Sequence, residues 1–306
     1  MSSPSTFHIW IAAARLRTLP LSVAGIFTGN ALAYQNKSFS WILFLGALLT
    51  ALSYQVLSNF ANDYGDGIKG TDNTHRLGPK RVLQQQWLTP KQLFKGIVLT
   101  VLASLVFSLG LIILAFGLKN FFWILIFFAL ALAAIWSAYN YTVGERAYGY
   151  HSLGDVFVFV FFGIVAVCGS FFLQLKVLTL DSFLYAICIG GLSTGVLNLN
   201  NLRDIENDRQ SNKRTLATLM GLNVGKWYQT ILVSGSMLCA GVASYQNAIS
   251  GGYKHLPMLV IFPLFFQLYQ LWQTKDNQAI DRLLKPLALS TFGFSVLLFS
   301  THLIFG

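Results

Sequence analysis

Long apolar runs recur along the whole chain, and they constrain its fold more than any other feature of the sequence. A helix needs about 20 predominantly apolar residues to cross the hydrocarbon core of a bilayer. The runs recur too often for a single membrane anchor. Charged residues make up only 10% of the 306 residues, whereas soluble domains carry about 25%. So little charge cannot cover a soluble surface, and we expect an all-α membrane protein.

The apolar runs predict nine membrane-spanning helices. An odd number of spans places the two termini on opposite sides of the membrane. With the N-terminus in the cytoplasm, only four of the 21 Lys and Arg residues fall on the outer side, which satisfies the positive-inside rule. The approximate bounds of the predicted spans are 18–35, 40–60, 93–117, 120–140, 154–175, 181–202, 225–246, 255–273 and 285–305.

Most connections between the predicted spans are short, but two inner loops are long, at about 61–92 and 203–224. Residues 7–17 are apolar and aromatic and end in two cations, so we expect a short interfacial helix there. The first ten residues lack the basic leader and apolar core of a secretory signal, so residue 1 is expected to begin the mature chain. We expect residues 1–306 to form a single domain.

Several classes of site are disfavoured by the distribution of charged and metal-binding residues. The net charge of +10 does not indicate a nucleic-acid partner, because the cations lie in turns between spans, where membrane topology explains them. Cys168, Cys188 and Cys239 lie in apolar runs without partners at metal-ligand spacing, which argues against disulfides and zinc. The five His residues are scattered and indicate no metal site.

Six of the 11 acidic residues fall in two clusters at the inner ends of predicted spans. The first sequence is N-D-Y-G-D-G-I-K-G-T-D at 62–72, and the second is N-N-L-R-D-I-E-N-D-R at 200–209. Clustered carboxylates repel one another and are costly near a membrane, so they need a cation. Helical spacing gathers the Asn and Asp side chains of each cluster on one face, and hard oxygen ligands of this kind suit Mg²⁺. The residues on these two faces are Asn59, Asp63, Asp66, Asn200, Asp204 and Asp208.

Both clusters are expected at the same face of the membrane, because the second and sixth predicted spans run in the same direction. Each cluster also has Asn four residues before its first Asp, which hints at an internal repeat. Acids, a metal and bases together suit a diphosphate group, and neutralising its charge allows it to leave an allylic carbon. The basic residues beside the acids are Lys69, Arg76, Lys80, Arg81, Lys213 and Arg214.

Ordinary alternatives exist for several of these residues. Lys80 and Arg81, with Lys91 and Lys95, are interpreted as determinants of membrane topology, whereas Lys69 stands inside the first acid cluster and is a candidate ligand contact. Asp155 begins the fifth predicted span, where a negative charge favours a helix N-terminus. The 26 Phe residues supply enough apolar surface for a groove that takes a hydrophobic tail.

At the two acid clusters the sequence resembles the UbiA family of membrane prenyltransferases, which carries N-D-x-x-D on the second span and D-x-x-x-D on the sixth. The resemblance covers essentially the whole chain. It implies a bundle around a central cavity that opens to the cytoplasmic side, with Mg²⁺ and a prenyl diphosphate bound beneath the two long loops. The implied metal ligands are Asp63, Asp66, Asp72, Asp204 and Asp208, and the implied diphosphate contacts are Asn59, Lys69, Asn200, Arg146 and Lys213.

Within that family the chain resembles the branch that prenylates 1,4-dihydroxy-2-naphthoate in menaquinone biosynthesis. The similar segments are R-L-R-T-L-P at 15–20, the first acid cluster, and the long stretch at 141–163. The resemblance implies transfer of a polyprenyl group with loss of the ring carboxylate, in a bacterial inner membrane. Tyr141 and Arg146 are candidates to orient the acceptor or the diphosphate. Gly70 stands where many relatives have a third Asp, and Asp72 follows two residues later.

Three other activities are weighed against this one. A sibling prenyltransferase would act on 4-hydroxybenzoate, homogentisate, haem or chlorophyllide. A secondary transporter would use intramembrane carboxylates for ions or protons, but such acids lie near the midplane and not beside cations at one face. A CDP-alcohol phosphotransferase needs D-G-x-x-A-R, and the residues after Asp66 and Gly67 do not match it.

Overall fold

The computed structural model describes residues 5–72, 77–79, 81–248 and 252–305, and this part of the chain is built from helices. In chain order they are α1 (Thr6–Ala14), η1 (Leu16–Thr18), α2 (Leu19–Gln35), α3 (Trp41–Ile68), α4 (Pro90–Phe116), α5 (Phe121–Asn140), η2 (Tyr148–Tyr150), α6 (Gly154–Val158), η3 (Phe159–Gly169), α7 (Ser170–Leu175), α8 (Leu180–Arg203), α9 (Ile205–Gln210), α10 (Leu216–Ala248), η4 (Gly252–Val260), α11 (Ile261–Gln273) and α12 (Asn277–Phe305).

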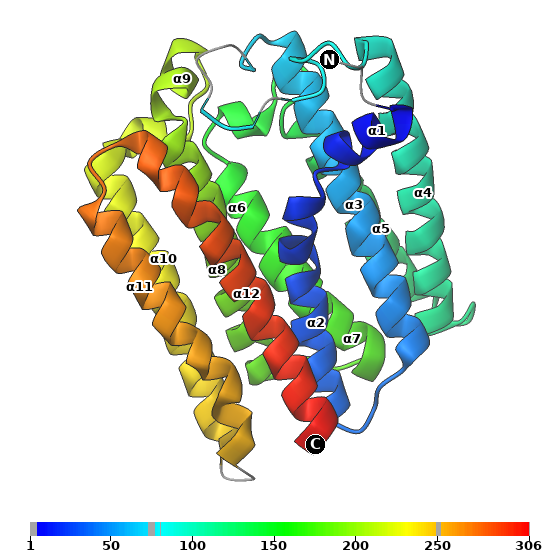
Figure 1. Cartoon of the computed structure of the whole chain (residues 1–306). Coiled ribbons are helices and arrows are strands. Elements are labelled where there is room, and N and C mark those ends of the chain that lie inside the picture. The colour runs from blue at the N-terminus through cyan, green and yellow to red at the C-terminus, as the bar shows by residue number, and fades with distance from the viewer. Residues whose placement is uncertain (1–4, 73–76, 80, 249–251, 306) are drawn as a thin grey trace.

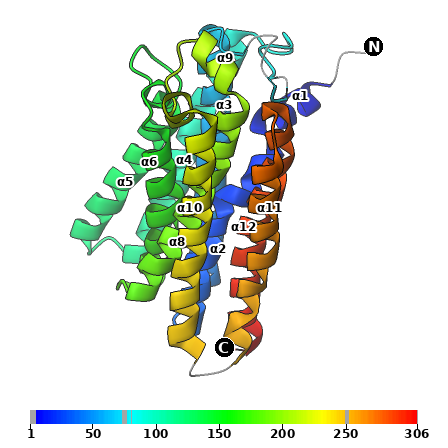
Figure 2. The same cartoon turned by 90° about the vertical axis from the view of Figure 1, so that its left-hand side faces the viewer.

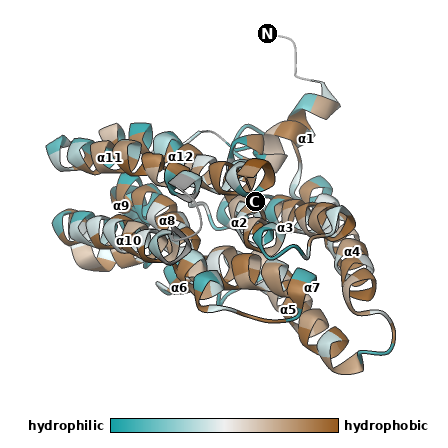
Figure 3. Ribbon diagram, turned by 90° about the horizontal axis from the view of Figure 1, so that it is seen from below, coloured by the Kyte–Doolittle hydropathy of each residue, from teal (hydrophilic) through white to brown (hydrophobic). Residues whose placement is uncertain are grey.

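The long helices run side by side along one axis (Figures 1 and 2). Seen from the end opposite α9, apolar residues extend along them (Figure 3). Within the described residues, eight helical segments are long and apolar enough to cross a membrane. These eight coincide with eight of the nine predicted spans. The chain is therefore a multi-pass membrane protein, as its composition predicts.

The count of nine spans is not confirmed. The seventh predicted span, 225–246, lies within α10, which packs against α8 and α11 but is not among the eight sufficiently apolar helices. Polar residues explain the difference, because Lys226, Gln229 and Ser236 are all buried on this helix. The described chain does begin and end at opposite ends of the bundle: α1 lies at the same end as α9, and α12 finishes at the other end (Figure 1).

The predicted interfacial helix before the first span is a separate element, α1. It ends at Arg15, whose left-handed backbone (φ of 50°) breaks the helix before η1 and α2 begin. Pro20 lies in the first turn of α2, where its missing N–H costs no helical hydrogen bond. This break directs the Arg15 side chain toward α3, where it contacts Asp63.

The two predicted long loops are shorter than the sequence suggests. The first connection runs only from 69 to 89, because α3 continues to Ile68 and a capping box of Thr89 and Gln92 begins α4. Most of the predicted loop at 203–224 is helical, which corrects that prediction. Thr215 and Thr218 exchange hydrogen bonds at the start of α10, and hydropathy does not detect such a polar helix start.

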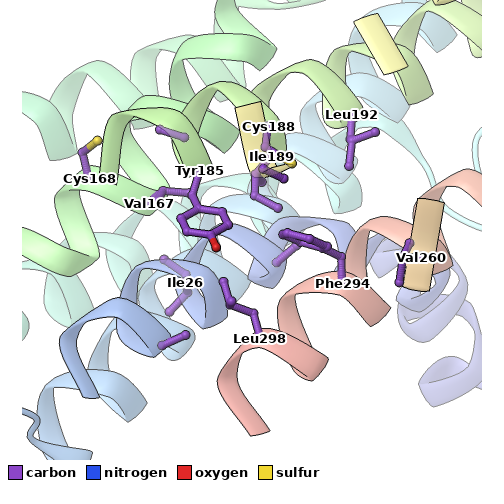
Figure 4. Close-up of a cluster of buried hydrophobic side chains, with 14 of the residues drawn as sticks. Ile26, Val167, Cys168, Tyr185, Cys188, Ile189, Leu192, Val260, Phe294 and Leu298 are labelled. Carbon is purple, nitrogen blue, oxygen red and sulfur yellow. The ribbon is translucent and has the colours of Figure 1, made fainter. Parts of the chain in front are cut away.

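The apolar core lies around α8, which packs against η3, α10 and α12. Tyr185 and Ile189 of α8 face Phe294 and Leu298 of α12 in a closely packed cluster (Figure 4). Gly163 of η3 and Gly190 of α8 permit the backbones to touch, because a Cβ on Gly163 would lie 2.7 Å from the Gly190 Cα. Small residues allow such close helix contacts in membranes. The packing fixes α8, and the second acid cluster begins directly after it, at its C-cap residue Asp204.

Candidate active site

A cavity of about 940 Å³ lies among α2, α3, α4, α5, η3, α8 and α12. Its lining divides into two parts. One end is polar and mainly cationic, whereas the remainder is formed mostly by aliphatic and aromatic side chains, with a few Ser and Thr hydroxyls among them. The charged and amide residues at the polar end are Arg15, Arg17, Asn59, Asn62, Asp66, Arg81, Asn200, Arg203, Lys213, Asp281, Arg282 and Lys285.

The first acid cluster occupies the last turns of α3. Asp63 and Asp66 are only 1% and 2% exposed, and buried carboxylates need compensating charge. Arg15 pairs with Asp63, and the Arg81 Nη1 atom lies 2.7 Å from an Asp66 oxygen. Asn59, one turn before Asp63, donates to the Ala14 carbonyl at 2.8 Å. The helix end is thus tied to the segment that carries Arg15.

Arg81 connects all three carboxylates of the first cluster. Its Nη1 atom also lies 3.0 Å from an oxygen of Asp72, and its Nε atom lies 3.5 Å from Asp63. Burial alone would lower the pKa of Arg81, but the charges of Asp66 and Asp72 raise it above the ordinary value. Arg81 is therefore a permanent cation at the polar end of the cavity, and Asp72 belongs to the first cluster.

The second acid cluster is compensated in the same way. The Arg203 Nη2 atom lies 2.6 Å from Asp204 and donates to the Asn200 side chain at 2.8 Å, while its Nη1 atom lies 2.6 Å from Asp281 of α12. Lys213 lies 3.8 Å from Asp208. Burial opposes the charge of Lys213, but Asp66 and Asp208 raise its pKa above the ordinary value.

Tyr150 joins the two clusters. Its hydroxyl donates to Asp66 at 2.8 Å and lies 2.6 Å from the Thr71 hydroxyl. The ammonium groups of Lys69 and Lys213 lie 4.1 and 5.5 Å from the centre of its ring, at cation–π distance. A side chain of the second cluster, Asn207, donates to the Thr71 carbonyl at 3.1 Å. The prediction that both clusters meet at one end of the bundle is confirmed.

Tyr141 lines the cavity beside the polar end. Burial raises the pKa of Tyr141 well above its usual range, and the carboxylates of Asp155 and Asp66 raise it further. The phenol therefore stays neutral and can donate a hydrogen bond. Arg146, the other residue suggested for this role, is exposed and is not among the cavity-lining residues.

Comparison with known proteins identifies the family of this chain. Residues 22–296 match the UbiA prenyltransferase family. The chain belongs to this family. A relative from Haemophilus influenzae, named 1,4-dihydroxy-2-naphthoate octaprenyltransferase, is 43% identical over 244 residues, 79% of each chain. A relative of the same name from Escherichia coli is 42% identical over 236 residues, covering 77% of this chain and 76% of that protein.

Solved structures of UbiA homologues share the fold. The apo structure from Aeropyrum pernix K1 superposes with a TM-score of 0.69 at 14% identity, covering 95% of this chain and 98% of that one. A homologue from Archaeoglobus fulgidus, described as bound to DMAPP and Mg²⁺, gives a TM-score of 0.63 at 12% identity, with coverage of 97% and 99%. At these identities the likeness establishes the architecture alone.

The UbiA motif residues predicted from sequence are therefore largely gathered, but their partners differ from the prediction. Asn59, Asp66, Asn200 and Lys213 line the cavity, together with Tyr141. The remaining Asp residues of the motifs lie behind this lining, within contact of its cations. Lys69 is exposed and contacts the Tyr150 ring. Arg76 and Lys80 lie outside the described residues.

Four important side chains of this UbiA site were not assigned to it from the sequence. The sequence places Arg81 beside the acids but favours a role in membrane topology, whereas the structure buries this side chain among carboxylates. Arg15, Arg203 and Tyr150 were not proposed as site residues. The segments carrying Arg15 and Tyr150 do stand out in the resemblance to the family, but nothing in the sequence pairs them with Asp63 and Asp66.

The donor set fits a magnesium ion that is shared with a diphosphate. Among residues 5–72, 77–79, 81–248 and 252–305, no three His, Cys, Asp or Glu side chains form a group that could hold a metal by themselves. Mg²⁺, however, is commonly held by one or two carboxylates together with substrate phosphate oxygens. Buried carboxylates at the cationic end, such as Asp66 and Asp208, provide that kind of ligand.

Proposed function

We propose that this protein transfers a polyprenyl group from a polyprenyl diphosphate to 1,4-dihydroxy-2-naphthoate. The acceptor loses its carboxylate, and the products are carbon dioxide, diphosphate and the reduced hydroquinone form of demethylmenaquinone, which becomes the quinone only after a separate two-electron oxidation. The acceptor and the long donor follow the names of relatives at 43% and 42% identity. The observation that carries the proposal is the divided cavity, with cations at one end and an apolar interior. Such a cavity is complementary to a charged head with a hydrocarbon tail.

The cations at the polar end bind the diphosphate. Arg81 and Lys213 remain charged because neighbouring carboxylates raise their pKa values, and Arg203 lines the same end of the cavity. Positioned cations stabilise the negative charge that develops on the leaving group, in a site from which water is largely excluded. Asn59 and Asn200 add amide groups to this end.

Mg²⁺ is the proposed cofactor. When bound, it would neutralise diphosphate charge and so promote departure of the leaving group from the allylic carbon. The oxygen ligands that this chain offers lie in both acid clusters, where each is now paired with Arg or Lys. They are Asp63, Asp66, Asp72, Asp204 and Asp208.

Tyr141 is proposed to orient the aromatic acceptor. It lines the cavity near the polar end, and its neutral phenol can donate a hydrogen bond to an acceptor oxygen while the ring packs against the acceptor. The apolar interior meanwhile excludes water from the allylic cation, which limits competing hydrolysis. The electron-rich ring carbon of the acceptor then forms the new bond, and the carboxylate leaves as carbon dioxide.

We further propose the setting of the enzyme. Residues 1–306 act as one domain in a bacterial inner membrane, with the N-terminus and the polar end of the cavity on the cytoplasmic side. The excess of Lys and Arg in the predicted inner loops supports this orientation. The donor then enters from the lipid, and the charged products leave to the cytoplasm.

A transfer assay tests the function. Purified protein is incubated with octaprenyl diphosphate, Mg²⁺ and 1,4-dihydroxy-2-naphthoate, and the prenylated product and released diphosphate are quantified. Product with carbon dioxide release is expected. Product formed only with another aromatic acid, such as 4-hydroxybenzoate, would reject the naphthoate acceptor. Absence of diphosphate release with every acceptor would reject the transferase and favour an ion or proton transporter.

The acid clusters are tested by separate substitutions. Asp63→Ala and Asp204→Ala each remove a proposed metal ligand, so we expect turnover to fall below detection while the protein still inserts into the membrane. Asp276→Ala is the matched control, since Asp276 lies outside both clusters in the turn before α12. Near-normal turnover in either cluster variant would refute the assignment of that cluster to the metal.

A further inference from the structure

The whole cavity, from its polar end to its deepest lining, is almost as long as the hydrocarbon core of a membrane is thick. Along α3 its lining extends from Asp66 to Ala47, and 19 residues at a rise of 1.5 Å span about 28 Å. The hydrocarbon core of a bilayer is about 30 Å thick. A tail whose diphosphate is held at the polar end can therefore reach the level of the opposite leaflet inside the protein.

The deep end of the cavity lies on one side of the bundle. The lining residues nearest the outer end come from α3, α4, α5 and α7, at Ala47, Ile112, Phe127 and Leu173. On α8, by contrast, the lining goes no deeper than Ser193, 13 residues after the helix begins. The cavity therefore slants toward α4, α5 and α7, and these helices determine where it ends.

An aromatic cluster lies at this deep end. The ring centre of Phe127 lies 5.0 Å from that of Phe116 on α4 and 5.8 Å from that of Phe172 on α7. Trp123, one turn before Phe127, lies 4.5 Å from Phe172. Phe116 and Phe172 are buried, and Phe127 alone of the four lines the cavity. Three helices thus supply one aromatic floor.

A cation holds the cluster from its far side. The Lys176 ammonium lies 4.4 Å from the centre of the Phe116 ring and donates to the Leu173 carbonyl at the end of α7. Both contacts fix α7 against α4, because a cation over an aromatic face and a capped helix end each favour this arrangement. The floor is therefore a packed part of the structure and does not depend on a tail for its formation.

We propose that Phe127 and the rings behind it set the length of prenyl tail that this enzyme accepts. The inference rests on the proposed function. An extended isoprenoid advances about 5 Å per five-carbon unit, given carbon–carbon bonds of about 1.5 Å. Between Asn59 at the polar end and Ala47 the lining of α3 covers 12 residues, or about 18 Å, which takes about three or four extended units. Shorter tails end before the floor, whereas longer tails meet Phe127 and must bend there.

The test measures kcat/KM for a series of all-trans prenyl diphosphates with three, four, six, eight and ten units. Phe127→Ala opens space toward the cluster and should favour long tails. We therefore expect kcat/KM for the ten-unit donor, divided by kcat/KM for the four-unit donor, to rise about tenfold or more, because differences in pocket size discriminate substrates on this scale. Phe127→Trp extends the floor into the cavity and is expected to lower the same ratio. Phe121→Ala, on the exposed start of α5, is the matched control and should leave it unchanged.

Ratios within one variant are independent of how much of the protein is folded, so a partly unstable variant still gives an answer. Phe127→Leu, which keeps more of the packing, provides a milder second variant. An unchanged length profile in both the Ala and Trp variants would overturn the inference and indicate that the tail leaves sideways between helices.

The role of Phe127 can be tested even if the protein has no prenyl-transfer activity. If the wild type transfers no prenyl group, the same length series is measured by the rise in unfolding temperature with Mg²⁺, because a ligand that binds only the folded state stabilises it. If the largest rise in unfolding temperature moves to longer tails in Phe127→Ala, the result would still support a role of Phe127 in limiting tail length. An unshifted profile would reject it.

Discussion

Tyr150 shows how a single side chain can organise this site without being one of the predicted ligands. Its hydroxyl donates to Asp66, and its ring lies within cation–π distance of both Lys69 of the first cluster and Lys213 of the second. Burial raises the pKa of Tyr150 well above its usual range, and the Asp66 charge raises it further. The hydroxyl therefore remains a donor and holds the Asp66 carboxylate in one orientation.

Replacing Tyr150 with Phe tests this role. The ring and both lysine contacts remain, but Asp66 loses a hydrogen bond to a charged group, typically about 1.5 kcal/mol or more. We expect kcat/KM to fall about tenfold or more with little change in unfolding temperature. Tyr269→Phe, at a largely exposed tyrosine of α11, is the control. Equal activity of the two variants would show that Tyr150 does not position Asp66.

At the residue scale the sequence predicts the acids better than the bases. Asp63 and Asp66 share a helix with Asn59, so helical spacing alone places them on one face. Arg15 and Arg81 reach the same carboxylates from other segments, and such contacts depend on how α1 and the loop after α3 pack. Arg146 illustrates the opposite error, because proximity in sequence to Tyr141 does not bring its side chain to the cavity.

At the scale of elements, close contact between η3 and α8 holds the second acid cluster in position. A Cβ on Gly163 would lie 2.5 Å from the Ala186 carbonyl oxygen and 2.7 Å from the Gly190 Cα. Neither backbone atom can move without shifting a helix. Eight spans could be predicted because each is a long apolar run. The start of α10 could not, because its capping threonines and polar buried face resemble a loop by hydropathy.

Gly163→Ala is predicted to destabilise the protein by about 1–3 kcal/mol, the usual cost of overpacking. Because α8 carries Asp204 at its end, activity should fall as well. The measurement is the unfolding temperature in detergent together with kcat. Gly110→Ala is the matched control: no other group lies within 4 Å of its Cβ position, so its stability should be equal or slightly higher. A Gly163 variant as stable as this control would contradict the close contact.

At the scale of the whole molecule, the account requires the polar end of the cavity to face the cytoplasm. Single cysteines in a background without the three native ones report the sidedness. A membrane-impermeant maleimide added to intact spheroplasts should label Lys119→Cys, between α4 and α5, but not Arg146→Cys, between α5 and α6. Both positions are exposed. The reverse pattern would place the site on the outer side and contradict the proposed orientation.

The central claim is that both acid clusters hold the same diphosphate, and a double-substitution cycle tests it most directly. The affinity for an unreactive prenyl thiodiphosphate with Mg²⁺ is measured for the wild type, Asp66→Asn, Asp208→Asn and the double variant. Groups that act on one ligand are energetically coupled, whereas independent sites add within about 0.5 kcal/mol. We predict that the double variant loses clearly less binding free energy than the sum of the single losses. Strict additivity, or wild-type affinity in Asp208→Asn, would contradict the account.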